Sequence, residues 1–323
     1  MKFRTELKIT SLAHPIALTE GMVALGSCFA TEIAEALTAH NLRIVCNPLG
    51  PLFNPLSIAS TLQRGYDHTP FTLDDLSTNS EGLYFTFAAS TRFVDRSAQA
   101  LLDRLNATIT QLHDALTKAS RIIITFGTAR AYRLQQSGEV VVNCHKEPQQ
   151  RFRCEQLSVS EIVACWERLL KGVLADKQVI LTLSPIRHLG DGLEANSLSK
   201  ATLRLAIEEL AVRCPHVSYF PAYELLMDDL RDYRFYADDL VHPSRQAVSY
   251  IVERFTEACF TASDRAYLNR IDRALAFVRH RPHDTTSESY LRGVRATLTE
   301  LRALQEEIKI DFSEQIATLE ALL

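Results

Sequence analysis

The stretch MVALGSCFA, residues 22–30, joins an apolar run to the start of a helical segment, Thr31–Ala39. The run Met22–Leu25 predicts a strand buried on both faces, as in a parallel sheet. Gly26 permits a tight turn because it has no Cβ atom. Ser27 then stands where the helix would begin, a position at which a serine is most often only a cap. The same position lies beside free backbone N–H groups, so Ser27 is also a candidate nucleophile.

Short apolar runs and longer helical patterns alternate along most of the chain. Further strand-like runs lie at Arg43–Cys46, Arg121–Phe126, Lys177–Leu183 and Val217–Phe220. Helical patterns lie at Ala98–Ala119, Ser160–Leu174, Ser197–Arg213 and Ser244–Phe260, and the last three each begin at a serine that would serve as N-cap. Two segments interrupt the alternation: Leu83–Phe87 alternates like a hairpin strand, and Val140–Phe152 is an irregular polar excursion. The pattern predicts an α/β fold, a doubly wound three-layer α/β/α sandwich around a parallel sheet.

The end of the chain departs from this alternation and is purely helical. A first apolar stripe spans Leu268–Val278, and a second runs from Leu291 to Leu319 in steps of three and four residues. The second stripe predicts one amphipathic helix, which would pack on its own domain or pair with a second copy of the chain. We therefore expect an α/β domain over residues 1–260 and a helical extension over residues 261–323.

Composition excludes several classes of protein. The 323 residues, 46% of them hydrophobic and 23% charged, are enough for one large globular domain with an appendage. A net charge of −4 without any basic run argues against a nucleic-acid partner. Seven scattered cysteines without a C-x-x-C pair argue against a disulfide framework, and no cluster has convincing metal-ligand spacing. No apolar leader or membrane-spanning run is present, so we expect a cytoplasmic protein with no membrane partner and no cofactor.

Asp239-Leu-Val-His242-Pro places a carboxylate three residues before an imidazole. The carboxylate can hold the Nδ1–H of the ring and leave Nε2 to take the proton of a serine. An isolated Asp-x-x-His is common by chance, and His242 alone would be a loop residue beside a capped helix. Together with Ser27, however, the pair supplies a nucleophile, a base and an acid. Since ligands of open parallel sheets bind beyond the carboxyl ends of the strands, these groups are expected at one edge.

Three further groups are candidates for the same edge or its surroundings. Arg187 and His188 follow a predicted strand, where they would bind an anionic or hydroxylated substrate or form a plain loop pair. His145 lies in the polar insertion, which could cover the site. Cys28 is an alternative nucleophile, although adjacent helical residues do not share a face and its thiol is expected to pack into the start of the helix.

The GSCFA pentapeptide at residues 26–30, together with Asp239-x-x-His242-Pro, resembles the GSCFA family of the SGNH/GDSL-like hydrolase superfamily. The resemblance covers roughly residues 1–260. It includes NPLGPLFNP at 47–55, TFGTA at 125–129, NCHK at 143–146, SPIRH at 184–188 and DYRFY at 232–236. It implies a flavodoxin-like sandwich with a serine esterase-type site. Ser27 would be the nucleophile, His242 its base, and Asp239 the residue that orients that base.

The resemblance also implies an oxyanion hole, to which Gly50 would donate its N–H. The wider superfamily adds an asparagine from a Gly-x-Asn element, whereas this chain has Gly127-Thr128-Ala129 there. Thr128 offers a shorter hydroxyl donor, and Asn54 or Asn143 would be the alternative amide. The sequence does not choose among them. Losing one such donor typically lowers the rate by about 10²–10³-fold.

We therefore expect a serine esterase or acyl hydrolase that acts on an O-acyl ester, with a carbohydrate or glycoconjugate ester as a candidate substrate. With a sugar hydroxyl instead of water as acceptor, the same site would make an O-acyltransferase. A non-catalytic module that binds a ligand or a partner is the alternative from another class. In that case, and in a homo-oligomer, the C-terminal helix would supply the interaction surface.

Overall fold

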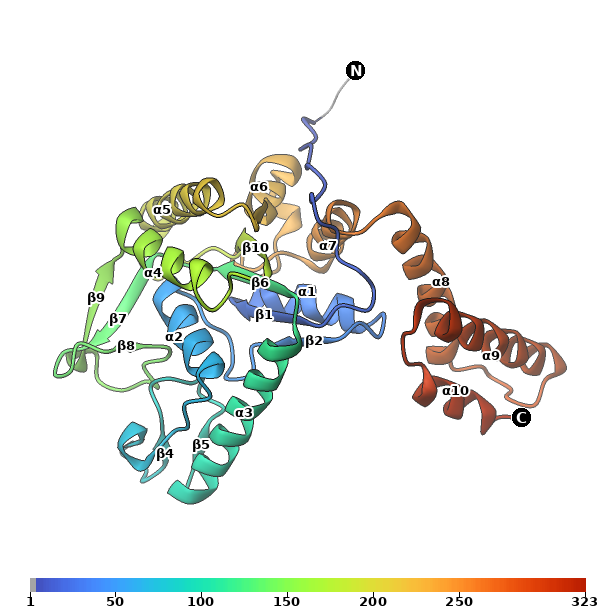
Figure 1. Ribbon diagram of the computed structural model, residues 1–323, viewed down its shortest axis with the longest axis horizontal. Coiled ribbons are helices and arrows are strands. Elements are labelled where there is room, and N and C mark those ends of the chain that lie inside the picture. The colour runs from blue at the N-terminus through green and yellow to red at the C-terminus, as the bar shows by residue number, and fades with distance from the viewer. Residues whose placement is uncertain (1–3) are drawn as a thin grey trace.

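The computed structural model describes residues 4–323, and a five-stranded parallel sheet lies at its centre (Figure 1). Its spatial order is β11-β10-β6-β1-β2. The strands are β1 (Met22–Gly26), β2 (Ile44–Cys46), β6 (Arg121–Phe126), β10 (Gln178–Leu183) and β11 (Val217–Phe220). In chain order this is the 2-1-3-4-5 arrangement of flavodoxin-like folds. The predicted α/β sandwich is confirmed.

The central strand β6 shows why its apolar run does not alternate with polar residues. Ile122 and Ile124 contribute to one hydrophobic cluster and Ile123 to another, and all three are 0% exposed. Successive side chains of a strand point to opposite faces. Both faces of the sheet are therefore covered, which selects a continuous β-branched run.

Helices form the two covering layers. Their bounds are α1 (Cys28–Thr38), α2 (Pro55–Tyr66), α3 (Ala98–Lys118), α4 (Val159–Lys171), α5 (Gly192–Arg213), α6 (Ala222–Glu224) and α7 (Arg245–Cys259). Apolar residues of α1, α6 and α7 share the cluster of Ile123, whereas those of α2, α3, α4 and α5 share the cluster of Ile122 and Ile124. Since the two sets of helices meet opposite faces of the sheet, the protein has three layers.

The predicted serine caps are correct for one helix out of three. Ser244 caps α7 and accepts a hydrogen bond from Ala247 N. The predicted cap Ser160 is wrong because Ser158 forms a reciprocal capping box with Glu161 two residues earlier. The predicted cap Ser197 is wrong because α5 begins five residues earlier, at Gly192.

The two interruptions are small antiparallel sheets. The first joins β3 (Ser77–Thr78), β4 (Tyr84–Phe85) and β5 (Val94–Asp95), and the second joins β7 (Arg130–Leu134), β8 (Val140–Val141) and β9 (Phe152–Gln156). The expectation that 140–152 is irregular is therefore partly wrong, since it contains β8 and the start of β9. Buried Phe85, Phe87, Val141 and Phe152 form a separate cluster between the insertions, which gives these short strands an apolar face.

The C-terminal segment forms three helices: α8 (Ala262–Arg279), α9 (Glu288–Ile308) and α10 (Ser313–Glu320). A single helix over 291–319 is wrong because Lys309 adopts a left-handed conformation, with φ of +58°, and ends α9. The side chain of Gln305 accepts a hydrogen bond from Phe312 N and so fixes the turn. Figure 1 shows these helices extending away from the α/β body.

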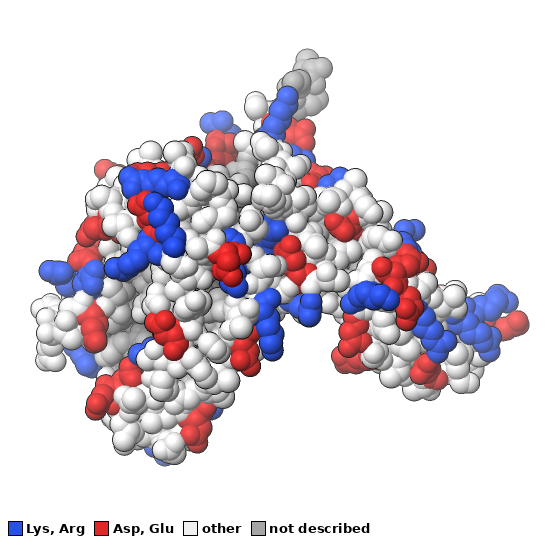
Figure 2. All heavy atoms as spheres, in the orientation of Figure 1, with Lys and Arg blue, Asp and Glu red and all other residues white. Residues whose placement is uncertain are grey.

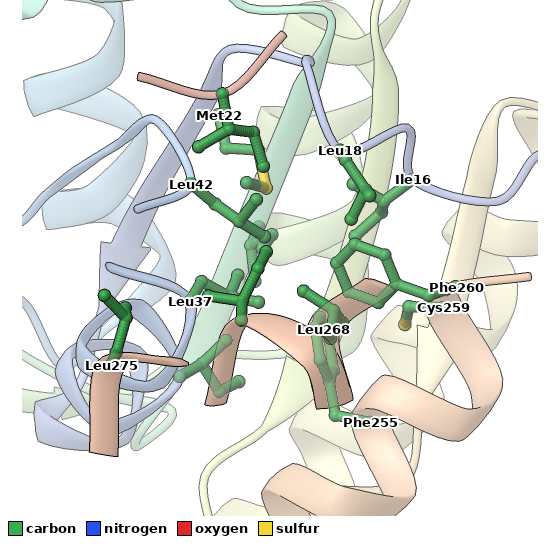
Figure 3. Close-up of a cluster of buried hydrophobic side chains, with 14 of the residues drawn as sticks. Ile16, Leu18, Met22, Leu37, Leu42, Phe255, Cys259, Phe260, Leu268 and Leu275 are labelled. Carbon is green, nitrogen blue, oxygen red and sulfur yellow. The ribbon is translucent and has the colours of Figure 1, made fainter. Parts of the chain in front are cut away.

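The C-terminal helices share the hydrophobic cluster that lies on the α1 and α7 face of the sheet. Figure 3 shows Leu268 and Leu275 of α8 in one cluster with Leu37, Leu42 and Phe255. Val294, Leu298, Leu301 and Leu304 of α9 belong to it as well, and each is at most 4% exposed. The apolar stripe of α9 is thus covered within the chain. A domain boundary at 260/261 and pairing with a second copy stay predictions.

Charge is evenly distributed over the surface seen in Figure 2, where Lys and Arg lie among Asp and Glu. Many of these groups pair with each other, as Arg270 does with Glu300 and Glu307 across α8 and α9.

Within residues 4–323, none of the helices has the length and hydropathy that a membrane span requires.

Candidate active site

Ser27 lies between β1 and α1, at the point where the order of the sheet reverses between β1 and β6. Such a switch point is where open α/β sheets bind ligands. The residue is the N-cap of α1, and its Oγ accepts a hydrogen bond from Phe29 N over 3.3 Å. It is only 1% exposed. The hydroxyl is therefore a buried cap that faces the positive end of the helix.

Gly26 sets the direction in which Ser27 leaves the strand. Its φ is +140°, and a Cβ atom at this position would lie 2.2 Å from Thr125 O. Its N–H donates to Oδ1 of Asn47 over 2.9 Å. Asn47 is 5% exposed and stands directly after β2, at the carboxyl edge of the sheet. The sequence analysis gave Asn47 no role, although its place directly after a predicted strand was a signal that it lies at the ligand-binding edge of the sheet.

Gly127 lies against the side chain of Ser27. A Cβ atom at Gly127 would be 3.4 Å from Ser27 Cβ and 3.0 Å from Phe53 O. The N–H groups of Gly127 and Thr128 both donate to Phe53 O, over 2.8 and 2.9 Å. Gly127 therefore lies next to Ser27, and its own closest neighbour is Phe53 O.

Asp239 and His242 form a local pair on the loop before α7. Oδ2 of Asp239 accepts from the Nδ1–H of His242 over 2.6 Å, and Oδ1 accepts from the backbone N–H groups of Val241 and His242, each over 2.9 Å. Both side chains are 49% exposed. The backbone and ring hydrogen bonds from His242, followed by that from Val241, lower the pKa of Asp239 to about 2. The pair thus holds the ring with Nε2 turned away from the carboxylate.

Arg187 supports this loop from the end of β10. Its backbone N–H donates to Val241 O over 3.2 Å, and its guanidinium donates to Leu240 O. The guanidinium also lies 4.2 Å from the centre of the Tyr236 ring, a cation–π contact. Arg187 is 8% exposed. This placement favours a structural role over contact with a substrate.

Electrostatics connect the histidine loop to the serine side. Burial and then the charge of Glu35 raise the pKa of Glu32 on α1, whereas His242, when it is protonated, and Arg245 oppose this shift. Glu32 lies on the helix that Ser27 caps. His242 is therefore within electrostatic range of α1.

His188 lies where the two sides meet. Its ring stands edge-on to that of Phe53, with 5.9 Å between ring centres. The carbonyl oxygen of Phe53 in turn accepts a hydrogen bond from Gly127 N, beside Ser27. Burial lowers the pKa of His188 to about 4, and the charges of Lys200 and His242 add to this effect. The ring is thus neutral near pH 7. It belongs to the site by position.

Lys200 of α5 also belongs to the site, although sequence reasoning did not single it out. It is 2% exposed, and its Nζ donates to Gly127 O and Ser184 O, each over 2.7 Å. Burial lowers its pKa to about 7. A signal was present, because Lys200 occupies the same helical register as buried Leu203, Ile207 and Leu210.

The predicted oxyanion donors have partners in this structure. The N–H of Ser27 donates to Thr125 O over 3.1 Å, and that of Gly50 donates to Asn47 O over 2.8 Å. Thr128 Oγ1 lies 3.1 Å from Ser199 Oγ. The Asn54 side chain caps α2: its Oδ1 accepts from the Ser57 N–H and its Nδ2 donates to the Ser57 hydroxyl, each over 2.9 Å. The two backbone N–H groups would have to exchange a partner to bind an oxyanion, and the assignment of all these donors stays a prediction.

Asn143 and His145 lie in the insertions. Oδ1 of Asn143 accepts from His145 N over 2.8 Å, and Nε2–H of His145 donates to Ala89 O over 3.0 Å. The His145 ring stacks on Phe85, with 4.5 Å between ring centres, and burial lowers its pKa. These contacts give both residues a role in holding the insertions together.

Cys28 is a weaker nucleophile candidate than its neighbour. Burial raises the pKa of its thiol, which disfavours the reactive thiolate. All seven cysteines are free thiols. Within residues 4–323, no group of three or more His, Cys, Asp or Glu side chains is placed to hold a metal ion.

A cavity with a volume of about 750 Å³ lies between α2, α4 and the two insertions, where Ala59, Phe87, Val141 and Leu169 contribute to its walls. Its lining does not include Ser27 or any other residue of the candidate triad. Since Ser27 is almost fully covered, an ester reaches Oγ only if neighbouring groups move. Such a change between free and substrate-bound enzymes is common.

The comparisons with known proteins assign most of the chain to one family. The model of the GSCFA family matches residues 21–255, a range that begins just before β1 and includes Ser27, Asp239 and His242. No curated protein matches the chain significantly. Membership of this family suggests a hydrolase-like function. Because the match covers more than half of the chain, the protein belongs to the GSCFA family.

Proposed function

We propose that the protein is a serine hydrolase that cleaves an O-acyl ester with Ser27 as nucleophile, His242 as base and Asp239 as the group that orients the base. The observation that carries the proposal is the 2.6 Å contact between Asp239 Oδ2 and His242 Nδ1. It fixes the tautomer in which Nε2 is free to accept a proton. The short loop and Arg187 hold the pair without help from a ligand.

In the first step Ser27 Oγ attacks the carbonyl carbon of the ester, and its proton passes to His242 Nε2. The tetrahedral intermediate then collapses, the C–O bond to the leaving alcohol breaks, and His242 returns the proton to that alcohol. Water attacks the resulting acyl-enzyme by the reverse transfers and releases the carboxylic acid. Asp239 remains ionised throughout and stabilises the imidazolium.

Negative charge on the carbonyl oxygen needs compensation close to Ser27. The N-terminal end of α1 supplies a positive field there. The N–H groups of Ser27 and Gly50 add hydrogen bonds when they are released from Thr125 O and Asn47 O. We propose a carbohydrate or glycoconjugate ester as the substrate. If a sugar hydroxyl replaces water in the second step, the enzyme transfers the acyl group instead.

A fluorophosphonate probe tests the nucleophile, because it phosphonylates activated serines. We expect the label on the peptide that contains Ser27, together with turnover of aryl esters. Ser27→Ala abolishes both, and His242→Ala lowers both by about 10³-fold or more. Cys28→Ala controls for the adjacent thiol, and Ser160→Ala controls for an exposed serine on α4. Both controls should retain the label.

Three other outcomes would change the proposal. Absence of labelling and of turnover over a panel of acyl esters, in a protein that is folded, contradicts the hydrolase and favours a ligand-binding module. A label on Cys28 would place the nucleophile one residue later. A panel that pairs each ester with sugar acceptors separates hydrolysis from acyl transfer by the product formed.

A further inference from the structure

Lys200 is a buried amine that has no carboxylate partner within residues 4–323. It is 2% exposed, and its Nζ donates to two backbone carbonyl groups and not to a carboxylate. Its neighbours are Gly127 O and Ser184 O, each at 2.7 Å, and the ring of Tyr223, whose centre is 5.5 Å away. Burial of an unpaired ammonium group is costly. The same end of the buried face of α5 carries Asn196 and Ser199, whose side chains accept hydrogen bonds from His188 N and Ala129 N, so this part of the helix supports the loops that follow the strands.

The two carbonyl groups belong to the ends of neighbouring strands. The last paired residues of β6 and β10 are Phe126 and Leu183. One more hydrogen bond follows, from Ser184 N to Phe126 O over 2.8 Å. Beyond it, Lys200 connects the strand ends by binding one carbonyl from each. The sheet is thus clamped at its carboxyl edge by a side chain from the covering layer.

The clamp acts on the residue that borders Ser27. Hydrogen bonds fix Gly127 on both sides. Its N–H donates to Phe53 O over 2.8 Å, and its carbonyl oxygen accepts from Lys200 Nζ. A Cβ atom at Gly127 would lie 3.4 Å from Ser27 Cβ, an ordinary van der Waals distance, so Gly127 borders the nucleophile directly. Phe53 in turn contacts His188, on the histidine side.

We infer that Lys200 is a positioning residue of the active site: it fixes the ends of β6 and β10 and thereby the surface against which the Ser27 side chain is held. The inference rests on the proposed function, since it concerns the reactivity of Ser27. Lys200 acts through Gly127 and does not touch the reacting atoms.

Lys200→Met tests this role because methionine retains the length of the side chain and removes its donors. We expect the rate of fluorophosphonate labelling at Ser27 to fall by about 10–100-fold, as for other small misplacements of reacting groups. For an aryl ester, kcat should fall by a similar factor with little change in KM. Lys200→Gln, which retains an amide donor on a shorter chain, should be intermediate.

Leu210→Ala is the matched control. Leu210 is buried in the same register of α5 but lies nearly three turns away, so its truncation destabilises the helix packing without touching Gly127. The full-length protein should lose thermal stability and retain the labelling rate of the wild type. A merely structural role for Lys200 predicts the same behaviour for Lys200→Met.

The outcomes separate the two proposals. Labelling of folded Lys200→Met within twofold of the wild-type rate overturns the positioning role and leaves the hydrolase intact. If both Lys200 variants are unfolded while Leu210→Ala is folded, Lys200 is a folding residue and the inference is also overturned. A wild type that is neither labelled nor active overturns the proposed nucleophile, and the inference with it.

Discussion

Ser27 and His242 are held by opposite kinds of structure. Ser27 is 1% exposed at the end of a central strand, whereas the Asp239 and His242 side chains are 49% exposed on a surface loop. The serine is placed by backbone groups that are distant in sequence, including Thr125 O and Phe53 O by way of Gly127. The pair is oriented by hydrogen bonds within four residues, and Arg187 alone among the groups described above supports its loop from a distant segment.

Because of this difference in burial, stability and activity are coupled on the serine side but not on the histidine side. Changes around Ser27 disturb the sheet edge and so affect folding together with reactivity. Changes in the histidine loop affect reactivity with little loss of stability, because partly exposed groups contribute little to folding. Substitutions on the two sides can break or sharpen this comparison.

The largest effect is expected for Gly26→Ala on the serine side. Its Cβ atom would lie 2.2 Å from Thr125 O in a backbone conformation with φ of +140°. We expect a loss of about 3 kcal/mol or more in unfolding free energy, measured by chemical denaturation, and loss of Ser27 labelling. Gly138→Ala is the control, because Gly138 also has a positive φ, +74°, but nothing within 4 Å of the added atom. If the two variants lose the same amount of stability, the backbone around Gly26 can move to make room for the added methyl group, and the prediction is wrong.

Asp239→Asn should have the next largest effect, and on activity alone. The amide no longer selects the tautomer with a proton on Nδ1, so kcat should fall by about 10²–10⁴-fold. The melting temperature should change little because the side chain is half exposed. With a pKa of about 2, the carboxylate of the wild type stays ionised down to about pH 3, so an acidic limb at higher pH must come from another group.

The neighbouring Asp238→Asn serves as the control for this change of charge. Asp238 is exposed, and its replacement should leave kcat near the wild-type value. If Asp239→Asn also retains wild-type turnover, the Asp239–His242 pair is not part of the mechanism.

Arg187→Met should have a smaller effect on the same side. It removes the bond to Leu240 O and the cation–π contact with Tyr236, so the loop gains freedom and kcat should fall by about tenfold. Arg234 is exposed and lies two residues before Tyr236, on the segment that Arg187 supports. Arg234→Met is therefore the matched control for the loss of a guanidinium. Steady-state kinetics on an aryl ester measure both. A rise in KM at constant kcat would instead indicate that Arg187 contacts the substrate.

The last prediction concerns the pH dependence of stability and His188, which lies between the two sides. Its pKa is about 4 in the folded chain against 6.5 for the free side chain, so the unfolded state binds more protons between these values. Stability should therefore fall as pH is lowered from 6.5 to 4, with a slope of up to about 1.4 kcal/mol per pH unit. Denaturation curves at several pH values should show a weaker slope for His188→Gln and an unchanged one for His283→Gln, at an exposed site.

Much of the fold could be predicted because local pattern and tertiary role agree. The run Arg121–Phe126 has the bounds of β6, since an unbroken β-branched segment suits only a strand covered on both faces. The prediction was poorer where a second signal competed. Ser158 and Ser160 are both good caps, and only the capping box with Glu161 decides between them. The apolar stripe of α9 continues past Lys309, so the break there is invisible in the periodicity.

By itself, the sequence determined the residue types of the candidate triad, the local Asp239–His242 pair and the α/β class, because each depends on residues that are close along the chain. Only the tertiary structure decided what surrounds Ser27. Asn47, Gly127 and Lys200 come from three different segments, and their contacts exist only once the strands and α5 have packed. The physical reason is that burial and long-range hydrogen bonds depend on packing that no local pattern encodes.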